Sequence, residues 1–489
     1  MHEQTPLVTD ATSVTTRPSR RDRILGLGAA LVFALVICGI AIFSPPSGKP
    51  FLSASAPSRY TVQLHQQASS STAPTASSAS PSNVILYSPP VDLRYGQVHN
   101  YLEEAADPLK FNLPLPDDLV SRYNGTGRSM AVTGYRFDFV RLQPDGSETP
   151  VPLYDLYDHH HVLVLWSASG MSNFGASFEY RGIQSATRAP YRRLVGNPSG
   201  WYPLMHLINT KHPTRAFDGR ASPLTQCPCS RQYEVDANAS TIGGHPISLS
   251  TCHADLVGNP ACDLETYTGG LFCCSENNMF LYDTDAECDD ANCTHLPVDR
   301  VYMKSTIDYE DATPETRPVV DLNCCDLPSH DNSTFANEFD VPACAPGTRP
   351  KDCVHAFETT VHIEWPSCVL GLDGECLENR THVELAYALP HLHEGGLSIE
   401  LLDAVTGQTI VSASRANGGV VEGTGNEPGN ERGYIVGFRE STWGVEDTPI
   451  FARGHPMRLR AVYNASVPIT GVMARVLLVG HPRVGPRAA

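Results

Sequence analysis

Two groups of histidines have residue types and spacings that could hold a metal ion. The first is the triplet His159, His160 and His161, which directly precedes the apolar run VLVLW. Neighbouring side chains of an extended chain point to opposite sides, so two adjacent histidines can reach one ion only where a bulge or a strand end turns both the same way. His206, inside the apolar segment WYPLMHLIN, is the expected third ligand, because a histidine buried in a strand must hydrogen-bond or coordinate something. A core histidine with an ordinary hydrogen bond is the alternative for His206.

The second group is the His391-Leu392-His393 motif, which opens the segment PHLHEGGLSIELLD. Residues i and i+2 of a strand share a face, so both imidazoles can point at one ion while Leu392 turns the other way. Met473, in the late segment ITGVMARVLLV, adds a thioether, and two imidazoles with one soft sulfur suit Cu(I). A polar strand face and a core methionine are the alternatives that need no metal.

Short strand-like segments must position these groups. Runs rich in β-branched and aromatic residues recur after residue 83, and Pro-, Gly- and Asn-rich turns separate them. The sequence therefore predicts an all-β fold, in which sandwiches or jelly rolls are favoured over a parallel α/β sheet. The clearest predicted strands are residues 161–166, 302–309, 359–365, 397–404, 433–438, 457–463 and 471–479.

The distribution of cysteines indicates disulfides and an oxidising compartment. Cys38 lies in an apolar run, and the other fourteen cysteines fall between residues 227 and 376. Adjacent cysteines rarely pair with each other, so we expect Cys273 and Cys274, and likewise Cys324 and Cys325, to bond elsewhere and staple a cysteine-rich insertion. Zinc is a weaker alternative, because no CxxC…CxxC or CxxC…HxxxH spacing is present.

Residues 24–43 form an uncharged apolar run long enough to span a membrane core of about 30 Å. Four arginines precede it, so the positive-inside rule predicts a single-pass type II protein with a cytoplasmic N-terminus and a lumenal or extracellular ectodomain. The membrane is then a partner of the protein, which contacts it through one helix formed by residues 24–43. A cleaved signal peptide and a secreted protein are the alternative. Residues 44–82 are rich in Ser, Pro, Ala and Thr and predict a disordered stalk.

Six Asn-x-Ser/Thr triplets agree with export into the secretory pathway and predict N-glycosylation. They begin at Asn124, Asn238, Asn292, Asn332, Asn379 and Asn464.

The net charge of -18 makes nucleic acid a poor partner, because a general basic surface is missing. A small molecule, a peptide or a glycan remains as the class of partner. The length of 489 residues is enough for two or three folded units.

Several blocks of the chain resemble the stress up-regulated Nod 19 family. They occur in the expected order over about residues 84–481 and include VPLYDLYDHHHVL, WYPLMHLIN, GGLFCCSENN, LPHLHEGGLSIELLDAVTGQ and GTGNEPGNERGYIVGF. That family is in turn similar, in the arrangement of its metal-type residues, to the copper type II ascorbate-dependent monooxygenases such as peptidylglycine α-hydroxylating monooxygenase.

The resemblance implies two jelly-roll domains, two copper ions and ascorbate as the reductant. Two of His159, His160 and His161 with His206 resemble the first copper site, and His391, His393 and Met473 resemble the second. The Tyr-x-His-His pattern of the family favours the first two histidines of the triplet, whereas the strand that follows fits the last two. The implied reaction is hydroxylation of an activated C–H bond, and no position matches the substrate-binding residues of the peptide or catecholamine enzymes.

We therefore expect two β domains that face each other across a cleft, with one histidine group on each side. The predicted segments are a cytoplasmic tail (1–23), a transmembrane anchor (24–43), a stalk (44–82), an N-terminal β domain (83–310) with a cysteine-rich insertion (about 220–300), a cysteine-containing connector (311–354) and a C-terminal β domain (355–481).

Three functions are compatible with this organisation. The first is a membrane-anchored copper monooxygenase with an unknown substrate. The second is a non-catalytic protein that binds copper on the same scaffold for storage or sensing. The third is a cell-surface recognition module that holds no metal.

Removal of the tail, anchor and stalk is expected to release a soluble, folded ectodomain that starts near Asn83. The reason is that the stalk has few large apolar groups to offset the entropy of ordering its chain. Gel filtration and circular dichroism of the shortened protein measure this, with the full chain in detergent as the control. Aggregation of the shortened protein beside a sound detergent sample would contradict the predicted boundary.

Overall fold

The computed structural model describes residues 82–100, 112–167, 170–174, 181, 184–212, 216–222, 235–236, 239–242, 245–246, 296–322, 324–327, 339–341, 344–372, 374–377, 379–417, 431–466 and 469–486. These residues form mainly β-strands, so the predicted all-β class is confirmed. Their helices are α3 (Asp117–Tyr123) and the short 3-10 helix η7 (Pro350–Asp352). The predicted tail, anchor, almost all of the stalk and most of the cysteine-rich insertion lie outside the described residues. Among the residues described, no helix has the length and apolar character needed to cross a membrane.

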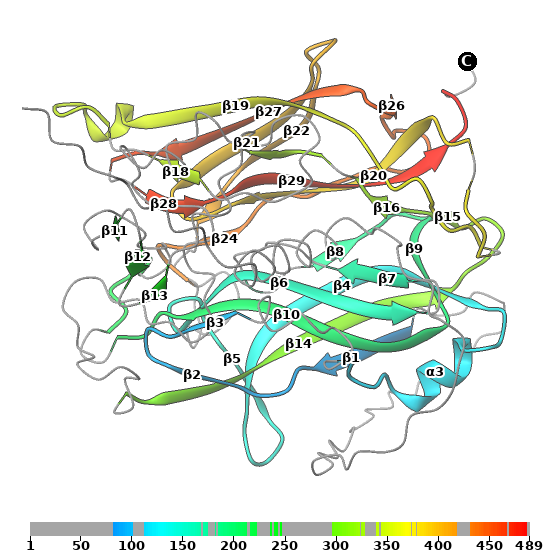
Figure 1. Cartoon of the computed structure of the whole chain (residues 1–489), viewed down its shortest axis with the longest axis horizontal. Coiled ribbons are helices and arrows are strands. Elements are labelled where there is room, and N and C mark those ends of the chain that lie inside the picture. Colours follow the sequence, from blue (N-terminus) through cyan, green and yellow to red (C-terminus); the bar gives the residue numbers. More distant parts are fainter. Residues whose placement is uncertain are drawn as a thin grey trace, which may run out of the picture.

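Two sheets make the lower half of the molecule in Figure 1, which we call the first sandwich. The outer, eight-stranded sheet contains β1 (Ser82–Tyr87), β2 (Val91–Arg94), β4 (Ser129–Leu142), β5 (Glu148–Pro150), β8 (Gln184–Ala186), β9 (Tyr191–Gly196), β14 (Val298–Asp311) and β15 (Arg317–Pro318). The inner, four-stranded sheet contains β3 (Val98–Asn100), β10 (Pro198–Asn209), β6 (Leu156–Ser167) and β7 (Gly170–Phe174), in that order.

Two further sheets make the upper half, the second sandwich (Figure 1). Its inner, six-stranded sheet contains β16 (Val320–Asp321), β17 (Asp326–Leu327), β20 (His382–Leu392), β25 (Ser441–Thr442), β26 (Ile450–Ala452) and β29 (Ala474–Arg483). Its outer sheet contains β19 (Val354–His362), β27 (Pro456–Asn464), β21 (Gly396–Asp403) and β22 (Thr409–Ser414). Smaller sheets pair β11 (Val235–Asp236), β12 (Ala239–Ile242) and β13 (His245–Pro246), then β18 (Phe339–Val341) with β28 (Ile469–Val472), and β23 (Ala416–Asn417) with β24 (Ile435–Gly437).

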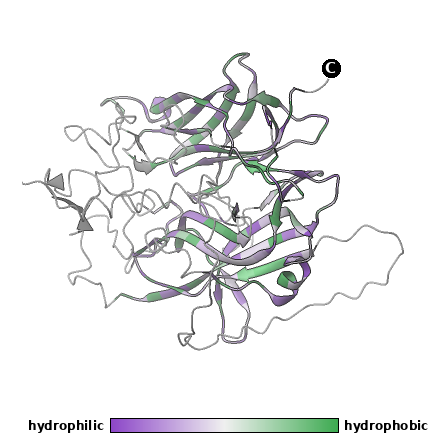
Figure 2. Ribbon diagram, turned by 45° about the vertical axis from the view of Figure 1, so that its right-hand side comes forward, coloured by the Kyte–Doolittle hydropathy of each residue, from purple (hydrophilic) through white to green (hydrophobic). Residues whose placement is uncertain are grey.

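Burial distinguishes the inner sheets from the outer ones. Buried positions alternate mainly with half-buried ones along β14 and β27, as expected for strands with one face on a core. In contrast, β6, β10 and β20 are buried at nearly every position. The hydropathy bands in Figure 2 follow the same alternation along many strands. The two inner sheets therefore lie against each other in the middle of the molecule, where polar side chains need partners.

The sequence predicted most outer strands well and the inner ones less well. Residues 302–309, 397–404 and 457–463 fall in β14, β21 and β27. Residues 471–479, predicted as one strand, divide into β28 and β29, and Met473 lies at the break. Strand β20 was not predicted, because a run buried on both faces shows no alternation and Pro390 interrupts its β-like residues.

Three disulfides join described cysteines. Cys344 pairs with Cys353, and Cys368 pairs with Cys376. Cys324 pairs with its neighbour Cys325, so the expectation that these two bond elsewhere was wrong. Cys325 has a positive φ of 77°, and this turn between β16 and β17 brings the adjacent sulfurs together. The pair Cys273 and Cys274 lies outside the described residues.

Three of the predicted glycosylation sites are described. Asn124 and Asn379 are exposed, and Asn464 is half-buried at the end of β27. Glycosylation at these sites stays a prediction, and Asn238, Asn292 and Asn332 lie outside the described residues.

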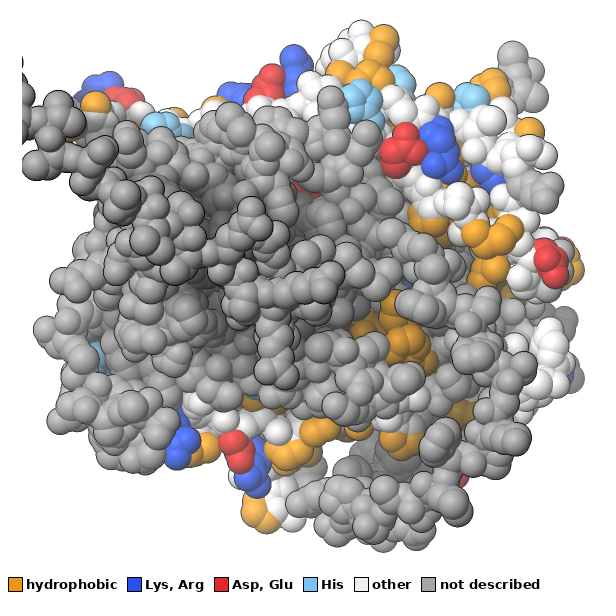
Figure 3. Space-filling view, viewed as in Figure 1, with side chains coloured by type: hydrophobic (Ala, Val, Ile, Leu, Met, Phe, Trp, Pro, Cys, Tyr) orange, Lys and Arg blue, Asp and Glu red, His pale blue; other side chains and the backbone are white. Residues whose placement is uncertain are grey.

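On the face shown in Figure 3, described basic and acidic side chains lie near one another rather than in blocks of one sign.

Glu384 ties the two sandwiches together. Its carboxylate on β20 is only 3% exposed. It accepts a hydrogen bond of 2.9 Å from the Tyr191 hydroxyl on β9, and Nη1 atoms of Arg317 (2.6 Å) and Arg483 (2.8 Å) donate to it. Tyr191 and Arg317 belong to the first sandwich and Arg483 to the second, so one buried carboxylate fixes the contact between them.

Replacing Glu384 by Gln should reduce the free energy of unfolding by about 1.5–3 kcal/mol, because Arg317 and Arg483, which are partly buried, lose the charge of the carboxylate that accepts their hydrogen bonds. Urea unfolding of the ectodomain measures this. Glu358→Gln is the matched control, because Glu358 pairs with Arg458 on the exposed outer sheet at 3.9 Å and should change stability by less than about 1 kcal/mol. Equal effects of the two substitutions would contradict a locking role for Glu384.

Candidate metal centre

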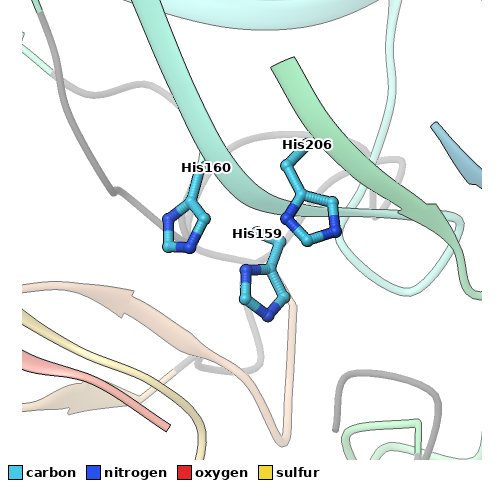
Figure 4. Close-up of side chains that lie close together, drawn as sticks. All are labelled: His159, His160 and His206. Carbon is cyan, nitrogen blue, oxygen red and sulfur yellow. The ribbon is translucent and has the colours of Figure 1, made fainter. Parts of the chain in front are cut away.

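A bulge in β6 turns two adjacent histidines to the same side. His206 on β10 lies opposite His160, but the next residue, Leu207, lies opposite Asp158, so His159 is the extra residue. An extra residue bends the strand locally and re-aims its side chain. The ring centroid of His159 lies 4.5 Å from that of His160 and 4.4 Å from that of His206. Figure 4 shows the three imidazoles gathered on one side of β6 and β10.

His161 points the other way, into the core of the first sandwich. Its ring stacks on Phe137 with centroids 3.5 Å apart, and its Nδ1 lies 2.6 Å from Oδ2 of Asp158. Burial raises the pKa of the Asp158 carboxyl, while the neighbouring His161 counteracts that rise. The adjacent pair that shares a face is therefore His159 and His160, and His161 lies outside the group.

The second group sits at the end of β20. Leu392 packs in the apolar core, and His391 and His393 flank it with ring centroids 5.0 Å apart. The chain then reverses at Gly395, whose φ of +88° favours glycine and where an added Cβ would lie 2.2 Å from Ile469. The strand therefore ends at Leu392, and the HEGG sequence that starts with the second histidine forms the turn.

The two groups meet instead of facing each other across an open cleft. His393 lies 4.7 Å from His159 and 5.5 Å from His160 between ring centroids. Two sets of three histidines have ligand nitrogens within 4.8 Å of one another, and His160 belongs to both. We call these five residues the histidine cluster: His159, His160, His206, His391 and His393.

Burial makes the cluster suitable for neutral imidazoles. All five residues are between 0% and 8% exposed. Burial, and next the neighbouring histidines, hold the pKa of His159, His160 and His391 well below 6.5. Neutral imidazole is the form that binds a metal, because the lone pair of a ring nitrogen is then free of a proton.

The residues present fit a copper ion. Nε2 of His391 is buried and makes no hydrogen bond to any described group, as expected for a nitrogen that faces an ion. Imidazole donors suit Cu, Zn, Fe and Ni, and a thioether would favour Cu(I). Met473 is 2% exposed, and its carbonyl oxygen accepts a hydrogen bond of 3.3 Å from the His393 N–H. Its backbone therefore lies beside the second group, and its sulfur as a ligand stays a prediction.

Two neighbouring features were not found from the sequence. The Tyr463 hydroxyl lies 3.2 Å from the His393 nitrogen and donates a hydrogen bond to the Met473 carbonyl, which ties the late strand to the turn after β20. Arg475, directly opposite His391 in the sheet, lies 3.1 Å from Asp326 in a buried ion pair. Neither residue occurs in a motif, so only the strand register reveals them.

Comparison with known proteins identifies the family. The family described as stress up-regulated Nod 19 matches residues 171–480, which is more than half of the chain. The chain belongs to this family. The match includes His206, His391, His393 and Met473, whereas the histidine triplet precedes it.

No curated protein matches the chain. Among solved structures, the chain has 8% identity to a Bacillus thuringiensis Cry1Da tryptic core variant, with a TM-score of 0.16 over 78% of this chain and 62% of that one. It has 11% identity to a structure of the infectious bursal disease virus Gx strain, with a TM-score of 0.08 over 82% of both chains. These likenesses are too weak to support an argument about fold or function.

The metal-free protein should lose stability as the pH falls below about 6.5. In that range the unfolded histidines bind protons while the buried ones stay neutral, so protonation favours the unfolded chain. Each such histidine adds a slope of about 1.4 kcal/mol per pH unit. Urea unfolding with a chelator at several pH values measures the slope, which His391→Gln should reduce and His382→Gln, on the same strand but at the surface, should not. An unchanged slope in His391→Gln would contradict the neutral state of the cluster.

Proposed function

We propose that this family member is an extracytoplasmic copper protein, anchored by residues 24–43, whose histidine cluster holds two copper ions. The supporting observation is the convergence of five buried imidazoles from both sandwiches. In a lumenal or extracellular compartment, where the cysteines are paired, this donor set suits copper in both oxidation states. We further propose that the two sandwiches are jelly rolls and that the activity is ascorbate-dependent monooxygenation of an unknown substrate at an activated C–H bond.

Each copper ion would have its own set of ligands. His159, His160 and His206 would bind one ion, and His391 and His393, with Met473, would bind the other. The His393 N–H contacts the Met473 carbonyl and the Tyr463 hydroxyl, which orient the second group. The inner sheets exclude water around both groups. Bound copper would supply one-electron redox chemistry and activation of dioxygen, with ascorbate as the source of electrons.

A non-catalytic copper protein is the second candidate, and one observation favours it. The most exposed member of the cluster is only 8% exposed, which suits storage or sensing better than open access for a large substrate. The contact between the groups also departs from two separate sites across a cleft. Turnover distinguishes the two candidates.

Copper analysis of the dialysed ectodomain should find about two ions per chain. The paired substitution His391→Ala/His393→Ala should remove the second ion, and His160→Ala should weaken binding of the first ion, of which His160 is a proposed ligand. Met473→Ile should preserve the fold and weaken only the second ion, since isoleucine lacks a thioether. His382→Ala on the same strand serves as the control. Full copper content in all variants, or none in the wild type, would refute copper binding by the cluster.

The monooxygenase activity is tested by oxygen uptake of the copper-loaded ectodomain with ascorbate. Uptake that needs copper and is lost in His160→Ala supports the catalytic form of the proposal. Normal copper content without copper-dependent uptake supports the storage or sensing protein instead.

A further inference from the structure

A pocket lies between the two sandwiches, beside the histidine cluster. The space inside it, including the part open to solvent, is about 780 Å³. From the first sandwich, β4, β6, β7, β8 and β9 contribute to its wall, and from the second sandwich β16, β20 and β29 do so. The wall therefore needs both sandwiches in place, as the histidine cluster does.

Strand register makes the pocket a continuation of the cluster. On β6, Val162 lines the pocket and shares a face with His160, two positions earlier. On β20, Tyr387 lines the pocket and shares a face with His391, four positions later. Arg475 lines the pocket as well and is the direct partner of His391 across the sheet. Two strands, β6 and β20, thus present histidine-cluster residues and pocket residues on the same faces, and β29 pairs with β20 beside them.

Arg475 is the polar group at this junction. It is only 5% exposed, and it lies directly opposite His391 in the sheet. Its ion-pair partner Asp326 lies 3.1 Å from Nε, but neither Nε nor Nη1 makes a well-directed hydrogen bond to a described group. A buried guanidinium with donors to spare is costly unless a ligand accepts from them.

The rest of the wall is mainly apolar. The pocket is lined by the apolar residues Val132, Phe174, Val319, Leu477 and Val479 and by the ion pair of Arg193 with Asp321. Arg193 makes two hydrogen bonds to Asp321, whereas Arg475 keeps N–H donors without a hydrogen-bond partner among the described residues, beside its ion pair with Asp326. Arg475 is therefore the side chain that can receive an anionic group. A ligand that fits this wall has an apolar body and one anionic end.

We propose that this pocket binds an organic anion with an apolar body, whose anionic group is received by Arg475 next to His391. This proposal rests on the proposed function, in which the ligand would be the substrate class, held with its anionic end at the copper centre. The pocket explains how a buried cluster can meet a small organic substrate from the space between the sandwiches.

The test uses 8-anilinonaphthalene-1-sulfonate, an apolar anion whose fluorescence rises on binding, beside its uncharged analogue N-phenyl-1-naphthylamine. The metal-free ectodomain should bind the anion at one site. Arg475→Gln should lower the affinity for the anion about tenfold or more, because hydrogen bonds from a charged donor are lost. The affinity for the neutral analogue should not change. Leu477→Trp, which fills the pocket, should remove both ligands. Arg460→Gln, on the exposed outer sheet, is the control.

Arg475→Gln leaves Asp326 buried without its partner, so the double variant Asp326→Asn/Arg475→Gln keeps the pair uncharged and protects the fold. The proposed anion site would be refuted if the double variant bound the anion as well as the wild type does. It would also be refuted if the Leu477→Trp variant still bound the anion. These outcomes are separate from the proposed function, because ligand binding is measured without metal. If the protein has full copper content but no anion site, only the proposed pocket is refuted. If it has the anion site but binds no copper, only the proposed copper function is refuted.

Discussion

The contact between the two inner sheets is the constraint on which the molecule depends. A strand buried on both faces has no solvent side to which a polar residue can turn, and β6, β10 and β20 are such strands. Each polar group there must therefore face another polar group or an ion. This layer contains the histidine cluster, the Glu384 carboxylate and the Arg475–Asp326 pair. In each of them, buried polar groups face other polar groups.

Small local irregularities convert this layer into a site. The bulge at His159 places two adjacent imidazoles together, and the turn at Gly395 follows directly on the end of β20 at Leu392 and on His393. Glu384 fixes the second sandwich against the first near the opposite end of β20. Without the bulge, His159 and His160 would sit on opposite faces of β6, because regular strands alternate their side chains.

The sequence predicted what depends on local rules and missed what depends on docking. The shared face of His391 and His393 follows from period-two geometry, and His206 followed from its apolar surroundings. The bulge at His159 could not be placed, because a run of three histidines looks the same in every register. The role of His160 in both groups, and the place of Arg475 opposite His391, arise only when separate segments pair or pack. The pairing of Cys324 with Cys325 depends on a left-handed turn that neither residue type indicates.

The division of the cluster between two sandwiches has a consequence for biogenesis. His160 and His391 are more than two hundred positions apart in the chain, so the first cannot meet the second until almost the whole ectodomain has been synthesised. Contacts of such long range form late in folding, since closing a large loop costs entropy before any contact is gained. Under the proposed function, metal acquisition would thus be a late event, and metal binding to the docked arrangement would stabilise it over the separated one by mass action. Local copper supply would then act as a checkpoint on the maturation of the whole protein.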